Sequence, residues 1–300
     1  MERRNGIETM LHYDEPVYRP PSEARSLILQ ATIGCSHNGC RFCYMYKGKR
    51  FRTKPWDELR ADIDAAARLR PDTRRIFLAD GDALVLSVEK LERILEYIGQ
   101  SFPRLQRVAA YATPQNLLSK TAAGLRGLRE KGLSILYYGV ETGDPDLLAR
   151  IGKGATPAEM IEGCRRAHEA GMKLSVTVIL GLAGRGGLER HAAATARLVN
   201  GIQPRYLSAL TLMPGPHGER YARAMPPHFS FSTPFDNCRE LGRMIEGLET
   251  ERCIFRSNHA SNYLALAGTL MKDRERLLAE VALALERPEQ FLRNEWMRGL

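Results

Sequence analysis

No stretch of this 300-residue sequence is apolar for long enough to cross a membrane. The longest apolar run, Leu174 to Ala183, falls well short of the roughly 20 residues that a spanning helix needs. The first residues, Met1 to Gly6, are polar and lack the apolar core of a secretory signal peptide. We therefore expect a soluble, cytoplasmic protein with no membrane partner.

The sequence also lacks the features of a disulfide-rich protein and of an ordinary hydrolase. Without a secretory leader, its six cysteines are not expected to form a disulfide framework. Cys238 and Cys253 lack the short spacing of a ligand pair, and Cys164 has apolar neighbours at helical spacing, which predicts a core thiol. A recognisable pairing of base and nucleophile is absent, so a barrel hydrolase or isomerase is the least favoured function.

Acidic residues are in deficit, with 35 Asp and Glu against 44 Lys and Arg, and the net charge of +9 suggests an acidic partner. The stretch from Arg41 to Trp56 has six basic residues, no acidic residue and interleaved aromatic residues. This pattern suits single-stranded nucleic acid, an acidic electron-transfer protein or an anionic small substrate. A solvated basic loop explains it equally well. The six are Arg41, Lys47, Lys49, Arg50, Arg52 and Lys54.

What the sequence does have is a regular alternation of strand and helix patterns, which predicts an α/β fold with parallel crossover units. The helical segment after Thr156 has the clearest start, with Pro157 at its first position, Glu159 completing a capping box and Gly171 ending it. Six such strands would form a closed or an open barrel. The expected strands are 26–33, 75–79, 107–112, 134–140, 173–180 and 206–212.

The first strand is followed by Cys35, Cys40 and Cys43, three thiols within nine residues. Three thiolates can hold three corners of a four-iron, four-sulfur (4Fe–4S) cluster and leave the fourth iron open. With His37, the same thiols could instead supply four tetrahedral ligands to a structural zinc ion. The surrounding strand and helix pattern favours the cluster, because a motif needs its structural context.

A cysteine loop directly after the first strand, with aromatic Phe42 before the third cysteine, resembles the radical S-adenosylmethionine (SAM) superfamily. The four residues between Cys35 and Cys40 resemble the elongator catalytic-subunit branch, and a later motif resembles the coproporphyrinogen-dehydrogenase branch. The resemblance implies an open, three-quarter parallel (β/α)6 barrel of TIM-like type. It also implies a 4Fe–4S cluster and SAM, which is cleaved reductively to a deoxyadenosyl radical.

The resemblance further implies three domains: an arm (1–25), a barrel (26–225) and a mainly helical C-terminal extension (226–300). Functional groups of parallel barrels lie at the carboxyl ends of the strands. The resemblance makes either Asp80 or Asp82 the partner of the SAM amino group, Glu141 the partner of the ribose and Lys153 the partner of the SAM carboxylate. The cofactor-binding residues that it implies are Phe42, Asp80, Gly81, Asp82, Glu141, Lys153 and Thr177.

The C-terminal segment offers candidates for substrate contact. A short strand at 253–256 is expected to join the barrel edge and to aim polar residues into its mouth, ahead of an apolar helix from Tyr263 to Leu285. Alternatively, Ser261 or Asn262 only caps that helix. The candidate catalytic residues are Arg256, Asn258, His259 and Asn262.

The leading prediction is thus a radical SAM enzyme acting on an unidentified small molecule or peptide. The basic segment from Lys47 to Lys54 is expected to dock an acidic flavodoxin- or ferredoxin-type electron donor. A nucleic-acid substrate is possible but not favoured, since no added RNA-binding module is visible. The alternatives are a zinc-stabilised nucleic-acid-binding protein and an RNA-modifying radical SAM enzyme.

Overall fold

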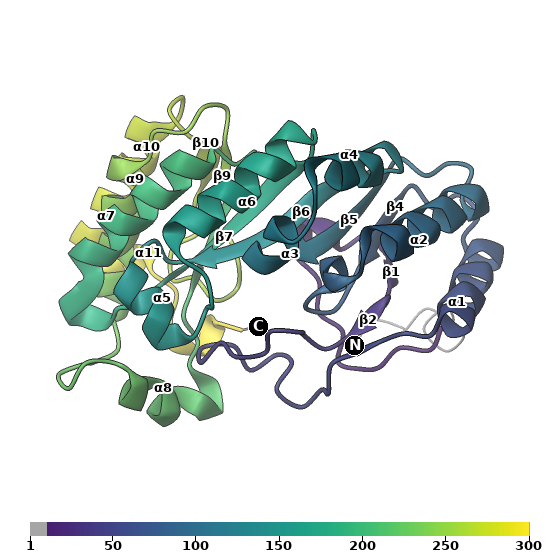
Figure 1. The fold of residues 1–300 in the computed structure, drawn as a ribbon. Helices are drawn as coiled ribbons and strands as arrows, with labels where there is room; N and C mark the ends of the chain where they lie inside the picture. Colours follow the sequence, from purple (N-terminus) through teal and green to yellow (C-terminus); the bar gives the residue numbers. More distant parts are fainter. Residues whose placement is uncertain (1–10, 300) are drawn as a thin grey trace. The chain divides into compact units, whose positions relative to one another are not determined.

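The computed structural model describes residues 11–299, in which strands alternate with helices along most of the chain (Figure 1). All six predicted strands are present. The mostly parallel sheet has the strand order β1-β4-β5-β6-β7-β8-β9-β10, as the predicted α/β barrel class requires. Its strands are β1 (Leu27–Leu29), β4 (Arg75–Leu78), β5 (Arg107–Ala112), β6 (Leu133–Glu141), β7 (Lys173–Leu180), β8 (Tyr206–Thr211), β9 (Ile254–Arg256) and β10 (Ala267–Thr269).

The helices have the spacing that their apolar residues predict. In α2, for example, Leu91, Ile94, Leu95 and Ile98 are all buried. No described helix is long and apolar enough to cross a bilayer. The helices are α1 (Trp56–Leu69), α2 (Val88–Ser101), α3 (Pro114–Leu118), α4 (Ala122–Glu130), α5 (Pro145–Ile151), α6 (Pro157–Glu169), α7 (Gly184–Ile202), α8 (Gly218–Ala224), α9 (Pro234–Gly247), α10 (Arg274–Glu286) and α11 (Pro288–Phe291).

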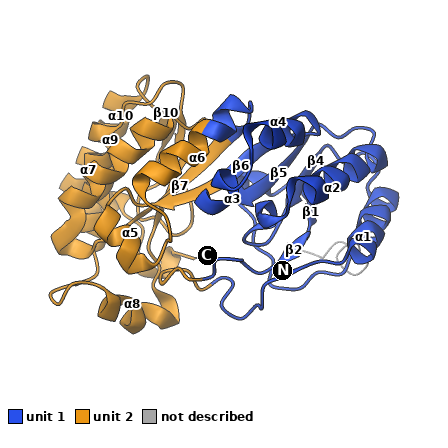
Figure 2. Cartoon of the chain, viewed as in Figure 1, with its two compact units in different colours: residues 1–38, 45–137, 166–173 blue, residues 39–44, 138–165, 174–300 orange. Residues whose placement is uncertain are grey.

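The chain divides into two compact units, which Figure 2 colours separately. Unit 1 comprises residues 1–38, 45–137 and 166–173, and unit 2 comprises residues 39–44, 138–165 and 174–300. The predicted domain limits at residues 25 and 225 follow a different division and stay a prediction.

In unit 1 the expected first strand is split into two short strands. β1 pairs in parallel with β4, whereas β2 (Thr32–Ile33) leaves that sheet and pairs antiparallel with β3 (Arg52–Thr53). The break falls at Gln30, whose side-chain amide exchanges two hydrogen bonds with the backbone of Asp14. The small β2–β3 sheet brings together the two ends of the segment that contains the cysteines.

The N-terminal arm packs into unit 1 and does more than lie over its surface. Phe77, Tyr111 and Tyr137 contact one another edge to face on one side of the sheet, and Val17 of the arm packs against this cluster. The hydroxyl of Tyr13 also donates to the carbonyl of Ile28 at 2.8 Å. The arm therefore covers part of the side of the sheet that bears these aromatic rings.

Unit 2 contains β7, β8 and β9 in parallel, so that their carboxyl ends share one edge, with β10 antiparallel to β9. Helices α7, α9 and α10 pack in succession beside them. The strand expected at 253–256 is present as β9 and pairs with β8, but β10 pairs on its other side, so β9 is not the edge of the sheet. Thr156 and Glu159 form the predicted capping box of α6, and Cys164 is buried as expected.

The predicted helix from Tyr263 to Leu285 is wrong in nearly its first half, since α10 begins only at Arg274. The chain forms β10 before α10 begins at Arg274, because Ala267 to Thr269 pair with β9 and Asp273 accepts a hydrogen bond from the amide of Thr269. The proposed cap at Ser261 or Asn262 is wrong for the same reason. Helical spacing of apolar residues could not show that the backbone of Ala267 to Thr269 pairs with a neighbouring strand.

Candidate functional site

Cys35 follows β2 in unit 1 and lies against the turn that ends β4. The backbone amide of Gly81 donates to the carbonyl of Gly34 at 3.0 Å. A Cβ atom at Gly81 would lie 2.6 Å from the Cβ of Cys35, closer than real contacts allow. The sequence expectation that glycine is needed here for close approach therefore has a specific cause, which is the neighbouring cysteine.

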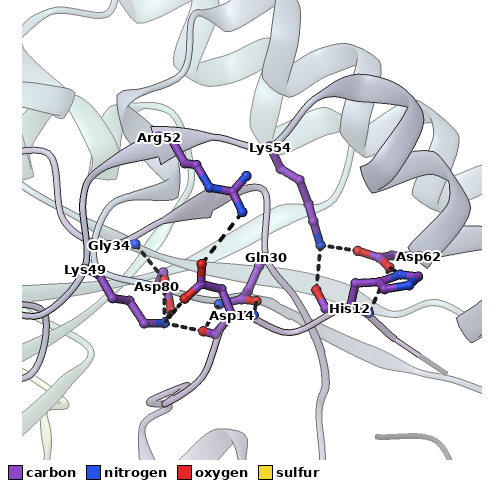
Figure 3. Close-up of polar contacts among 9 residues, drawn as sticks. All are labelled: His12, Asp14, Gln30, Gly34, Lys49, Arg52, Lys54, Asp62 and Asp80. Carbon is purple, nitrogen blue, oxygen red and sulfur yellow. Dashed lines mark hydrogen bonds and ion pairs between the residues drawn. The ribbon is translucent and has the colours of Figure 1, made fainter. Parts of the chain in front are cut away.

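Asp80 fixes the base of the cysteine loop (Figure 3). Its fully buried carboxylate accepts a hydrogen bond from the amide of Gly34 at 2.7 Å and forms an ion pair with Lys49 at 3.2 Å. Gly34 begins the loop and Lys49 ends it, so one carboxylate holds both ends. Lys49 also donates to the carbonyl of Asp14 in the arm. We call Asp14, Lys49 and Asp80 the loop clasp.

The basic segment is less available to a partner than its sequence suggests. Lys49 is 9% exposed and Lys54 is 8% exposed, and both neutralise buried carboxylates inside unit 1. Lys54 pairs with Asp62 and donates to the carbonyl of His12 at 2.9 Å (Figure 3). Tyr46 is buried too. The exposed cations of the basic segment within unit 1 are therefore Arg50 and Arg52.

Asp82 differs from Asp80 because part of its carboxylate is unused. It is fully buried and accepts a hydrogen bond from Ser36, but its Oδ1 atom has no hydrogen-bond partner among the described residues. Burial raises the pKa of Asp82, although the polar side chains of Ser36 and Asn116 and the nearby Lys120 ammonium oppose that shift. The unused oxygen makes Asp82 the better candidate of the two for a protonated amine.

Cys40 and Cys43 lie in the segment 39–44 of unit 2, beside the end of α5. The amide of Arg41 donates to the carbonyl of Ile151 at 2.8 Å, which anchors the segment. Nearby, Lys153 forms a 2.9 Å ion pair with Glu141. Burial lowers the pKa of Lys153, but the charges of Glu141, Cys40 and Cys43 raise it above its usual value. The ammonium group therefore lies within electrostatic reach of both thiols.

Glu141 ends β6 in a left-handed backbone conformation, with φ of 65°. This conformation is uncommon for residues other than glycine and is worth noting at a site. Gly139 makes room for the resulting carboxylate, because a Cβ atom there would collide with Oε1 of Glu141 and lie 3.3 Å from Nζ of Lys153. The structure thus brings two predicted residues, Glu141 and Lys153, into one ion pair.

Thr177 is partly exposed in β7, on the same side of the strand as Ile179, and stands in register with Ser208 of β8. The following turn lacks the acidic residue that the resemblance would place there. Instead, Glu240 from α9 accepts a hydrogen bond from the amide of Gly181 at 2.9 Å. His191 of α7 contacts the other Glu240 oxygen, so the turn is held by a buried pair from two helices.

The polar segment after β9 divides into exposed and structural residues. Arg256 and Asn258 are exposed, and His259 is half-buried with its ring 2.9 Å from the Ser261 hydroxyl. Asn262 is buried, and its amide group contacts Thr211 and the carbonyls of Ala209 and Ser257. Asn262 therefore stabilises the segment through contacts within unit 2.

The donor set fits a cluster that needs three thiolates. The described cysteines form no disulfide. Between residues 11 and 299, no three His, Cys, Asp or Glu side chains are gathered closely enough for a single metal ion. A 4Fe–4S cube has a different requirement, because each thiolate binds a different iron atom. The unused oxygen of Asp82 fits an additional polar ligand beside Cys35 and Gly81.

The family is shown by sequence comparison. A family model described as the radical SAM superfamily matches residues 29–197, more than half of the chain. The chain belongs to the radical SAM superfamily, whose cofactors are a 4Fe–4S cluster and SAM. The match favours the cluster over the alternative zinc site.

Individual proteins are similar to this chain in sequence or in fold. The heme chaperone HemW of Bacillus subtilis (strain 168) is 28% identical over 157 residues, which are 50% of this chain and 41% of that protein. The structure is similar to coproporphyrinogen III oxidase from Escherichia coli, with a TM-score of 0.56, 16% identity and coverage of 74% of this chain and 51% of that one. Methylornithine synthase gives a TM-score of 0.52, 15% identity and coverage of 83% and 72%. The chain thus spans about half the length of the first two.

Sequence reasoning missed several residues that position the site. The sequence places Lys49 in the basic segment that is expected to dock a partner, and it gives no direct sign that Lys120 or Glu240 helps to position the site. No local pattern marks them, because their partners Asp80, Asp82 and Gly181 are distant in sequence. For Glu240, the sequence offers one indirect indication: the turn after β7 lacks the acidic residue that the resemblance would place there, so another part of the chain has to supply it.

Proposed function

We propose that Cys35, Cys40 and Cys43 hold the cluster and that the enzyme cleaves SAM to abstract a hydrogen atom from a small molecule or peptide. The unused Oδ1 of Asp82 carries this proposal, since it offers a buried acceptor for the SAM amino group beside Cys35 and Gly81. When bound, the reduced cluster supplies the electron that breaks the SAM sulfonium bond. The protein itself binds and orients SAM and the substrate, and it excludes water from the site.

The proposed roles of the remaining residues follow from their surroundings. Lys153, beside Cys40 and Cys43, supplies a cation for the SAM carboxylate, and Glu141 accepts from the ribose hydroxyls once the ion pair between them opens. Phe42 lies between the two cysteines and contributes an aromatic wall. In unit 2, Thr177 faces the ligand, and the exposed Arg256 and Asn258, with His259, contact the substrate.

Electron delivery is the proposed role of the exposed basic residues. Arg50 and Arg52 dock an acidic flavodoxin- or ferredoxin-type donor, and Lys49 and Lys54 are excluded from that surface by their buried ion pairs. Electrostatic attraction of this kind accelerates association and is screened by salt.

The SAM cleavage assay tests the proposed function. Protein prepared without oxygen and reconstituted with iron and sulfide is mixed with SAM and dithionite, and 5′-deoxyadenosine is measured by chromatography. The expected result is deoxyadenosine from the wild type and almost none from the Cys35/Cys40/Cys43→Ala variant. A wild-type protein that carries about four irons but releases no deoxyadenosine would contradict the proposal.

Similarity to a heme chaperone supports a second candidate, heme binding without turnover of SAM. The assay separates the two functions. Heme binding followed by absorbance, together with absence of deoxyadenosine, would favour the second candidate.

A further inference from the structure

Unit 1 has a basic hollow at the opposite end of its strands from Asp80 and Asp82. Its volume is about 430 Å3, and its lining includes Arg25, Arg70, Arg74 and Arg75. We call these four residues and the space that they line the arginine hollow. Nothing in the proposed SAM chemistry uses it, because the turn that carries Asp80 and Asp82 follows the carboxyl end of β4, whereas Arg74 and Arg75 are at its beginning.

The topology of the sheet explains why the arginines meet. β1 and β4 are parallel neighbours with Leu27 opposite Ile76, and Arg25 and Arg74 each lie two residues before this pair. The turn from α1 into β4 brings Arg70 to the same edge. Thr73 fixes this turn, because its amide and hydroxyl both donate to the carbonyl of Arg70, at 3.1 and 2.8 Å. The hollow is therefore part of the built fold.

The charges in the hollow are unbalanced. None of the four arginines forms an ion pair or side-chain hydrogen bond with any residue between 11 and 299. The one carboxylate in the lining, Asp72, is already paired with Arg104 at 3.1 Å. The negative end of the α1 dipole accounts for a cation at Arg70, directly after the helix. It does not account for Arg25, Arg74 and Arg75.

We propose that the arginine hollow binds phosphate groups, either of a small oligophosphate or of a nucleic-acid backbone. All the cations in the lining are arginines, whose planar guanidinium groups bind phosphate oxygens in pairs. A concave space of this volume admits a few phosphate groups. A folded acidic protein has a rounded surface, and its binding would need a broad and flat face instead. Exposed Leu69 and Pro71 give the hollow an apolar wall beside the cations.

Binding to the cluster-loaded full chain tests this proposal without any measurement of SAM cleavage. Fluorescence anisotropy follows a labelled single-stranded RNA of twelve nucleotides, and unlabelled tripolyphosphate competes. The test variant is Arg74→Gln/Arg75→Gln. The control is Arg126→Gln/Arg197→Gln, which removes the same charge from two exposed positions outside the hollow. Thermal unfolding confirms that both variants are folded.

The test variant is expected to weaken RNA binding by about tenfold or more, and the control by much less. The slope of log affinity against log salt should decrease by about 1.4 for two lost phosphate contacts. Competition by tripolyphosphate would identify a small-oligophosphate site, and RNA binding without competition would identify a backbone site. Equal losses in both variants, competition by poly-glutamate as strong as by tripolyphosphate, or no binding at low salt would each overturn the proposal.

Discussion

At the scale of single residues, Asp80 and Asp82 show how two neighbouring carboxylates acquire different roles. Both are fully buried, but Asp80 binds an amide and an ammonium group that belong to the fold, whereas Asp82 keeps an unused oxygen. The sequence alone left them as equal candidates. The structure distinguishes them because Lys49 reaches Asp80 from 31 residues away, a pairing that no local motif encodes.

We predict that Asp82→Asn weakens SAM binding and leaves the cluster in place, because the neutral amide no longer attracts an amine. Calorimetric titration of SAM into the anaerobic protein measures the first effect and iron content the second. Asp80→Asn serves as the comparison, and we expect it to reduce stability more than SAM affinity. Equal SAM affinities of the Asp82→Asn variant and the wild type would contradict the assignment.

A second residue-scale prediction concerns the loop clasp. Lys49→Met leaves the buried Asp80 carboxylate without its counter-charge, which should lower the free energy of unfolding by about 3 kcal/mol. The double variant Lys49→Met/Asp80→Asn removes both charges and should recover part of this loss. Urea unfolding of all variants measures the coupling. A double variant that is less stable than Lys49→Met would show that the pair does not act through charge.

At the scale of elements, short sequence patterns predicted the helices and strands that depend on contacts between residues close in sequence. The capping box of α6, the buried face of α2 and the six strands follow from short-range patterns. The break of the first strand at Gln30 depends on the distant arm, and the late start of α10 depends on pairing with β9. Neither contact leaves a mark in the nearby sequence, so both boundaries were predicted wrongly.

The start of α5 gives a prediction for pH dependence. Burial would raise the pKa of Asp144, but the Arg190 guanidinium and the amides of Leu147 and Asp146 lower it below its usual value of 3.8. Since the folded-state pKa lies below the unfolded value, the stabilisation is complete above pH 3.8 and lost as the pH falls through the folded-state pKa.

Asp144→Ala should therefore destabilise the protein by about 1 kcal/mol at neutral pH, and by progressively less below the usual pKa of an aspartate. Urea midpoints of the wild type and the variant, measured at several pH values, test this. A difference that stays constant down to the acid limit would show that the charge of Asp144 contributes nothing.

At the scale of the whole molecule, the cations behind the net charge of +9 have different roles. Some of its cations balance buried carboxylates, as Lys49 and Lys54 do, and others line the arginine hollow. Composition predicted the acidic partner, but it could not predict which cations remain exposed. That depends on how the chain folds around Asp62 and Asp80.

If Arg50 docks an acidic electron donor, Arg50→Glu should slow cluster reduction by reduced flavodoxin several-fold at low salt. Reduction by dithionite, a small molecule that needs no docking surface, should be unchanged and serves as the control. Stopped-flow absorbance measures both rates. Flavodoxin rates that are insensitive to the variant and to salt would exclude this docking surface.

The central claim is that Cys35, Cys40 and Cys43 hold a 4Fe–4S cluster, and metal content with absorbance tests it most directly. Protein purified and reconstituted without oxygen is compared with the Cys35/Cys40/Cys43→Ala variant, and Cys164→Ala, which alters a buried core thiol, is the matched control. We predict a brown wild-type protein and Cys164→Ala variant with about four irons each, and a colourless triple variant. A colourless wild type that holds one zinc ion would contradict the account.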